Sequence, residues 1–154
     1  MTQALTKPSK TSLYDRDLNL WLETAIAQLR VTNFRELDVE NLIEELEGLA
    51  GRDKRELKNR LIVLLEHLLK RLYVDMPQEF NGWQRTIWEQ RTQIEILFEQ
   101  SPSLKNLWED YFESAWHYAF KKVNREYNNF GFPHAWSFNS DINSLLTIDF
   151  WENA

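Results

Sequence analysis

The sequence predicts an all-α protein, a compact four-helix bundle-like domain with a long central helix and an aromatic C-terminal segment draped over it. Apolar residues recur at helical spacing along most of the chain. Only four Gly and four Pro occur in 154 residues, whereas sandwiches and barrels need more turn residues. Aromatic residues make up 14% of the chain, so there is ample apolar surface to bury in a core.

The length suits a single helical domain, which we place at residues 12–154. Residues 1–11 are polar and contain no continuous apolar stretch, so we expect a disordered tail there. The longest unbroken aliphatic run, residues 61–65, is far shorter than the roughly 20 residues that a membrane span requires. We therefore expect a protein that does not cross a membrane.

Helix boundaries follow from capping residues and from the spacing of apolar side chains. Ser12 is a plausible start for a first helix over residues 13–30. Asp38 is a good N-cap for a second helix that continues to Val74. Gly48 and Gly51 each weaken this helix by up to about 1 kcal/mol relative to alanine. We therefore expect a kink or short break near Gly51.

The second half of the chain divides in the same way. Asn81 and Gln84 resemble a capping box that opens a third helix ending near Gln100. Ser101 followed by Pro102 predicts the start of a fourth helix. After Gly131 we expect a short helix at residues 141–146, with the rest of the segment lying over the bundle.

The segment from Leu57 to Tyr73 is apolar on most sides of a helix. A helix of that kind belongs in the middle of a bundle. Its polar residues fall in one sector of about 140° at 100° per residue; they are Asn59, Arg60, Glu66, His67, Lys70 and Arg71.

Several segments, taken in order, resemble the bacterial family catalogued as domain of unknown function 29. They are Tyr14-Asp15 with Asp17 and Trp21, NLIEELEGL at 41–49, LLEHLLKRL at 64–72, Trp83 with TIWEQR at 86–91, SPSL at 101–104 and DFW at 149–151. The resemblance spans nearly the whole chain. It implies an all-helical bacterial protein with no established activity, substrate or cofactor.

Two sets of residues are candidates for metal binding or acid-base catalysis. Glu40, Glu44 and Glu47 lie within about 60° of one another on a helix, and crowded carboxylates can hold a hard cation. His67, on the polar sector, could act as a ligand or base. One hypothesis is thus a small metal-dependent hydrolase that uses His67 with Glu44, Glu45 or Glu47. The alternative is a solvated acidic face and a structural histidine.

Other function classes find little support. No Walker loop, no Gly-x-Ser-x-Gly and no His-Glu-x-x-His motif is present, and we expect no cofactor. The absence of Cys fits a reducing cytoplasm. The basic cluster at residues 52–60 follows five carboxylates in residues 38–47, and the net charge is -6. Nucleic acid is therefore an improbable partner.

The leading hypothesis is a non-enzymatic protein-interaction module, either homodimeric or bound to another protein. The acid-then-base order of residues 38–60 suits antiparallel pairing with a second copy. Arg52 and Arg55 are candidate contacts in that segment, as are Trp116 and Phe120 on the predicted fourth helix. The apolar surplus of that helix meets either the C-terminal segment or another subunit. A third idea is that the acidic chain masks a basic partner.

Overall fold

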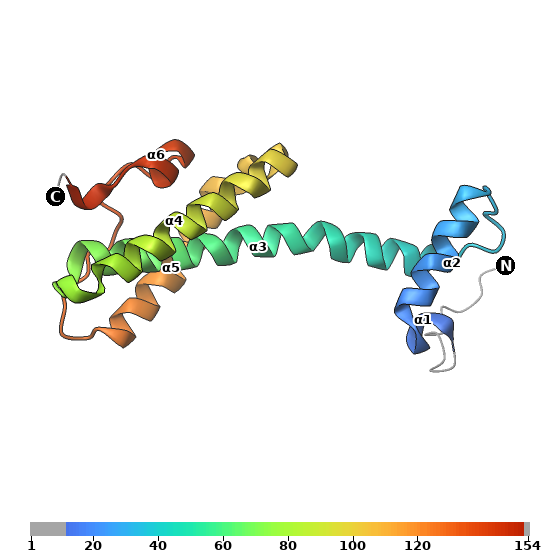
Figure 1. Ribbon diagram of the computed structural model, residues 1–154, viewed down its shortest axis with the longest axis horizontal. Helices are drawn as coiled ribbons and strands as arrows, with labels where there is room; N and C mark the ends of the chain where they lie inside the picture. The colour runs from blue at the N-terminus through green and yellow to red at the C-terminus, as the bar shows by residue number, and fades with distance from the viewer. Residues whose placement is uncertain (1–11, 153–154) are drawn as a thin grey trace. The chain divides into compact units, whose positions relative to one another are not determined.

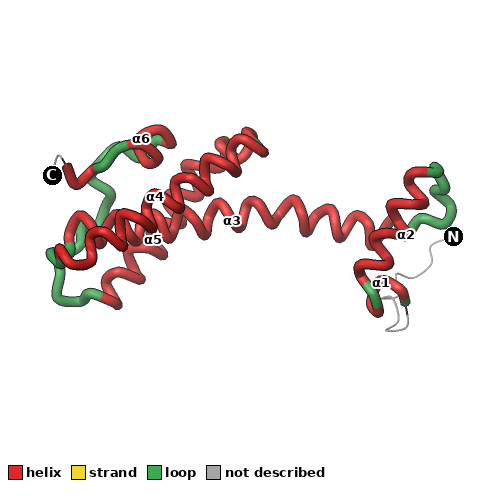
Figure 2. The backbone as a smooth tube through the Cα atoms, viewed as in Figure 1, coloured by secondary structure: helices red, strands yellow, loops and turns green. Residues whose placement is uncertain are grey.

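The computed structural model describes residues 12–152, and these contain helices joined by turns, with no strand (Figures 1 and 2). The predicted all-α class is therefore confirmed. The expected tail at residues 1–11 lies outside the described residues. Contacts divide the chain into two units, residues 1–51 and residues 52–154, and the single domain predicted over residues 12–154 stays a prediction. No helix in the described part is long and apolar enough to cross a membrane.

The N-terminal unit opens with two helices where the sequence predicted one. Helix α1 covers Leu13–Arg16 and helix α2 covers Leu18–Arg30. The side chain of Asp17 accepts a hydrogen bond of 3.0 Å from the backbone N–H of Leu20, which caps α2 and ends α1. A single helix over residues 13–30 was therefore wrong, because an aspartate that caps its own downstream turn competes with helix continuation.

The third element of this unit is the first part of α3, which covers Val39–Tyr73. Asp38 precedes it as predicted, and its carboxylate accepts from the N–H of Asn41 at 3.4 Å. The indole Nε1 of Trp21 donates to the same carboxylate at 3.3 Å. Trp21 and Ala25 are the buried apolar residues of α2, so the unit has a small core.

Helix α3 continues through Gly51 as one α-helix. The break predicted near this residue is therefore wrong. Glycine weakens a helix by only about 1 kcal/mol relative to alanine, which is too little to interrupt a cooperative helix of 35 residues.

The C-terminal unit is built on the remainder of α3, as the sequence predicted. Six leucines of this segment are 0% exposed: Leu57, Leu61, Leu64, Leu65, Leu68 and Leu69. They belong to cores that also contain residues of α4 (Pro77–Gln100) and α5 (Trp108–Glu126), and Figure 1 shows these two helices beside this part of α3. The chain joins α4 to α5 through the 3-10 helix η1, Pro102–Leu107.

Two boundaries in this unit differ from the sequence prediction. Helix α4 begins at Pro77, before the capping box predicted around Asn81, because proline at the first helical position lacks only an N–H that would be unpaired. Pro102 opens the 3-10 helix η1 rather than an α-helix, and α5 starts at Trp108.

The C-terminal segment lies over the bundle as predicted. It contains helix α6, Ile142–Thr147, capped by the side chain of Asp141, and the short 3-10 helix η2, Phe150–Glu152. Phe150 belongs to the main core, and Trp136 and Phe138 pack against it. The ring centroids of Trp136 and Phe150 lie 5.1 Å apart in an edge-to-face arrangement.

Candidate functional site

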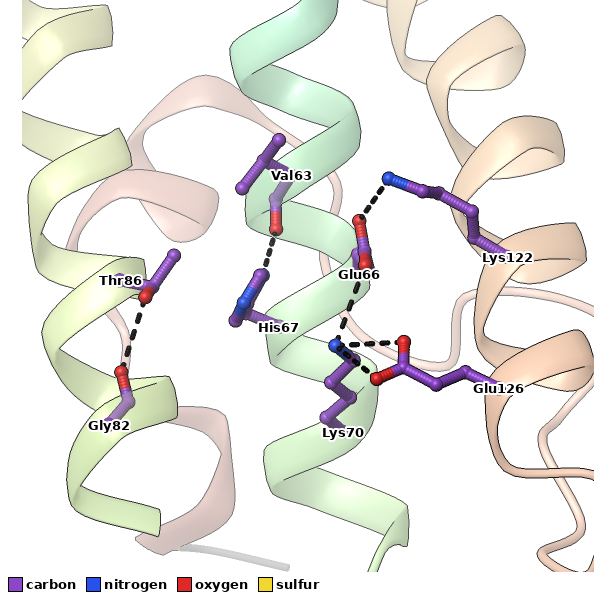
Figure 3. A network of polar contacts seen from close by, with 8 residues as sticks. All are labelled: Val63, Glu66, His67, Lys70, Gly82, Thr86, Lys122 and Glu126. Atoms are coloured by element: carbon purple, nitrogen blue, oxygen red, sulfur yellow. Dashed lines mark hydrogen bonds and ion pairs between the residues drawn. The ribbon is translucent and has the colours of Figure 1, made fainter. Parts of the chain in front are cut away.

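A network of charged side chains joins α3 to α5 in the C-terminal unit (Figure 3). Glu66 and Lys70 are only 5% and 6% exposed, one helical turn apart on α3. The Nζ atom of Lys70 lies 3.5 Å from Glu66 and 3.1 Å from Glu126 of α5. Lys122 approaches the second oxygen of Glu66 at 3.3 Å. Two cations thus balance two anions.

This balance has a structural consequence. A buried charge is tolerated when it is paired and hydrogen-bonded, and removing one partner leaves the other uncompensated. The ring of Tyr127 covers Lys70, with Nζ 5.7 Å from the ring centroid. Burial raises the pKa of the Tyr127 phenol. The network therefore holds α5 on α3 in one register, and it leaves no unpaired charge among its members that could act on a substrate.

His67 lies beside this network but is bonded to its own helix (Figure 3). Its Nδ1 atom is 2.8 Å from the carbonyl oxygen of Val63. The carbonyl can only accept, so Nδ1 carries the proton and donates. Burial lowers the pKa of His67 below 6.5, and Lys70 lowers it further, against the opposing hydrogen bond to Val63 and the charges of Glu66 and Glu126. The imidazole is half-buried and neutral at neutral pH.

The lowered pKa of His67 predicts a pH-dependent stability. Protonated His67 is less favourable in the folded chain than in the unfolded chain, because its folded pKa is lowered. The free energy of unfolding is therefore highest above about pH 6.5, the pKa of histidine in an unfolded chain. It falls as the pH drops below that value toward the lower pKa of the folded state. We expect His67→Gln to reduce the loss of unfolding free energy between neutral pH and pH about 5. Urea denaturation at both pH values measures it, with His117→Gln at an exposed position as control. An unchanged pH dependence in His67→Gln would contradict this reading.

The acidic residues predicted as ligands lie on α3 in the N-terminal unit. Glu44 and Glu47 are exposed, and Glu45 accepts a hydrogen bond of 2.6 Å from the Tyr14 hydroxyl. That hydrogen bond, together with burial, raises the pKa of Tyr14 to about 12. Residues 12–152 contain no group of three or more His, Asp or Glu side chains that could hold a metal ion. The candidate ligands Glu44, Glu47 and His67 are thus not brought together as a metal centre.

The two arginines predicted as contacts line an open groove in the C-terminal unit. Arg52 and Arg55 of α3 line it together with Gln90 of α4. The groove has a volume of about 440 Å³. Arg60 is fixed in its wall by Glu56 at 2.9 Å and by Gln90 at 3.2 Å. A groove with several guanidinium groups suits carboxylate partners, because arginine binds them with two parallel hydrogen bonds.

The predicted contacts Trp116 and Phe120 have intramolecular partners. Their rings stack with centroids 5.8 Å apart. The indole of Trp116 donates to the carbonyl of His134 at 3.4 Å, and its ring also meets Trp136 edge-to-face. The sequence left open whether the extra apolar surface of α5 packs against the C-terminal segment or another subunit. In the structure, Trp116 of α5 packs against the C-terminal segment.

Arg91 is a structural anchor that the sequence analysis missed. Its guanidinium is buried and donates to the carbonyl of Leu145 at 2.8 Å, to the carbonyl of Ile148, and to the carboxylate of Asp149 at 3.1 Å. Burial lowers its pKa, against the opposing effect of Asp149. A signal was present, since Arg91 lies on the apolar stripe between Ile87 and Ile94. A charge on a core-facing stripe indicates a buried partner.

Comparison with known proteins gives the family. The family model described as domain of unknown function DUF29 matches residues 13–151. The chain belongs to this family. The DUF29 match extends over both units and includes all six α-helices described above, which confirms the resemblance drawn from the sequence. No curated protein and no solved structure matches the chain.

Proposed function

We propose that this DUF29 protein is a non-enzymatic interaction module whose partner is a second copy of the same chain. The observation that carries the proposal is the exposed apolar surface of the N-terminal unit. Ten of the fourteen exposed large hydrophobic residues in the described chain lie there: Leu18, Leu20, Ile26, Leu29, Val31, Phe34, Val39, Ile43, Leu46 and Leu49.

Such a concentration is unusual for a surface that stays in water. Exposed apolar residues scattered singly need no explanation, whereas a cluster of them marks an interaction surface. Phe34 is 63% exposed and Val31 is 71% exposed. Covering side chains of this size contributes roughly 25 cal/mol for each Å² removed from water.

Charge complementarity favours a second copy over an unrelated partner. Residues 38–47 contain five carboxylates and no cation, and residues 52–60 contain five cations and two carboxylates. A chain with both blocks on one helix can satisfy each block with the other block of a second copy. The absence of Cys supports a reducing compartment, and we place the protein in the cytoplasm.

We expect the full-length protein to be a dimer in solution. Size-exclusion chromatography with light scattering should give twice the 18.6 kDa mass of the chain. Hydrogen exchange at two protein concentrations should show slower exchange of residues 18–50 in the more concentrated sample, because association covers and stabilises that unit. The amides of α4 serve as an internal control. A mass of one chain at the highest soluble concentration overturns the proposal, and a dimer without this protection overturns the assigned surface.

A further inference from the structure

We infer that a cleft beside α6 binds a basic segment of another protein, with lysine or arginine side chains on its rim and apolar side chains on its floor. All the residues that line this cleft belong to the C-terminal unit. The inference therefore does not depend on the self-association proposed above, which uses the exposed apolar surface of the N-terminal unit.

The cleft consists of two adjoining hollows. The larger has a volume of about 780 Å³ and is lined by residues of η1, of α5 and of the chain at the start of α6. The smaller has a volume of about 320 Å³ and is lined by residues of α4, η1 and α6. Lys105 and Ile142 line both hollows, and we call the two together the acidic cleft. Volumes of this order accommodate several side chains of a bound segment.

The floor of the acidic cleft is apolar and held in place by the core. Phe98 and Trp108 are only 5% and 4% exposed, and their rings meet edge-to-face with centroids 6.0 Å apart. The indole Nε1 of Trp108 donates to the carbonyl oxygen of Ser140 at 2.7 Å. A floor that is already ordered reduces the entropy lost when a partner binds. The other apolar residues of the lining are Phe112, Ile142 and Leu146.

The charged lining of the acidic cleft is mostly negative. Among the described residues that line it, the only cation is Lys105, whose Nζ atom lies over the ring of Phe98, 5.8 Å from the centroid. In residues 12–152 none of the lining carboxylates has a Lys, Arg or His within ion-pair distance. The cleft therefore has an excess of negative charge that these residues do not neutralise. Its five exposed carboxylates belong to Glu95, Glu99, Glu109, Glu113 and Asp141.

The spacing of four of these carboxylates opposes the stability of the helices that carry them. Glu95 and Glu99 are four residues apart on α4, and Glu109 and Glu113 are four residues apart on α5. Like charges at this spacing repel each other across one helical turn. The carboxylates of the network between α3 and α5, in contrast, each lie beside a lysine. A cationic segment in the cleft relieves both repulsions.

The fifth carboxylate belongs to a wall that is fixed in position. The carboxylate of Asp141 accepts a hydrogen bond of 3.1 Å from the backbone N–H of Ser144. Hydrogen bonds from Ser144 lower the pKa of Asp141, so this group is ionised at neutral pH. Arg91 of α4 holds the same wall through the carbonyl of Leu145. The wall therefore presents a permanent negative charge at a defined place.

A basic peptide segment fits the acidic cleft better than the other cationic or polymeric ligands. Residues 12–152 contain no group of three or more His, Asp or Glu side chains that could hold a metal ion. The phosphates of a nucleic acid would be repelled by the rim. Lysine and arginine side chains carry long apolar stems below their charged ends, so a segment that contains them complements both the rim and the floor.

A synthetic peptide tests the chemistry of the cleft. The probe is a fluorescein-labelled hexapeptide of alternating lysine and leucine, and fluorescence anisotropy measures its binding to the full-length protein. We expect binding that weakens as the salt concentration rises, weaker binding of hexalysine, and no binding of a hexapeptide of alternating glutamate and leucine. No binding of the lysine-leucine peptide overturns the inference. Equal binding of hexalysine also overturns it, because the floor would then contribute nothing.

A pair of double variants tests the place of binding. We expect Glu109→Gln combined with Glu113→Gln to raise the dissociation constant of the lysine-leucine peptide about tenfold, because two ion pairs are lost. The substitutions also remove a repulsive pair from α5, so the variant should fold, which circular dichroism verifies. The matched control is Glu79→Gln combined with Glu89→Gln, which removes the same charge from exposed positions of α4 outside the cleft.

The two double variants and light scattering separate the outcomes. A larger dissociation constant in the cleft variant alone supports the inference. Equal dissociation constants in the two double variants overturn the assigned cleft. We expect the cleft variant to keep the mass of the wild-type protein in solution. A cleft variant that loses self-association would show that a second copy occupies the cleft, and this would overturn the inference while the self-association itself stands.

Discussion

Arg91→Met is expected to lower the free energy of unfolding of the C-terminal unit by about 3 kcal/mol, because buried carbonyl groups lose their donor. Methionine retains an unbranched apolar stem but donates no hydrogen bond. The carbonyls of Leu145 and Ile148 and the carboxylate of Asp149 all bond to this one guanidinium. Its loss should therefore release the segment around α6 from α4.

Two measurements check this result. Urea denaturation gives the change in stability, and limited proteolysis of the native protein reports cleavage near α6. Arg85→Met is the matched control, since Arg85 is an exposed arginine on the same helix and surface substitutions usually change stability by less than about 0.5 kcal/mol. Equal stability and equal protease resistance in the two variants would show that Arg91 does not anchor the segment.

Leu65→Ala is expected to destabilise the same unit by about 2–5 kcal/mol. Leu65 is 0% exposed and belongs to the main core, together with Ile94 of α4 and Ala115 of α5. Removing its isobutyl group costs the transfer free energy of the lost atoms and leaves a cavity that a packed core fills only partly.

Tryptophan fluorescence during urea denaturation reports on this unit, because six of the seven Trp residues lie after residue 51. Ile96→Ala on α4 is the control, since Ile96 is 39% exposed and its truncation opens no enclosed cavity. A loss in Leu65→Ala no larger than that in Ile96→Ala would be inconsistent with a central position for this part of α3.

Local sequence patterns were sufficient to predict most of the helical architecture. The apolar segment from Leu57 to Tyr73 predicted a central helix, and six of its seven leucines are 0% exposed. Asp38 predicted a helix start, and Asp141 caps α6 at the predicted place. Caps and hydrophobic periodicity are visible in sequence because they involve residues within a few positions of one another.

Fine boundaries were less predictable, since they depend on competition between similar local energies. Asp17 divides the first helix because its side chain caps the next turn. Gly51 does not break α3, because a single glycine costs less than the helix around it gains. Neither outcome follows from residue type alone.

By itself, then, the sequence determined the helical class, the family and the identity of the central apolar helix. Only the tertiary structure decided which polar groups are paired. It placed Arg91 on carbonyls more than fifty residues away, joined Lys70 of α3 to Glu126 of α5, and left Glu44 and Arg55 exposed. The physical reason is that pairing and burial depend on contacts between distant segments, and helical periodicity carries no information about which distant segment a polar side chain will meet.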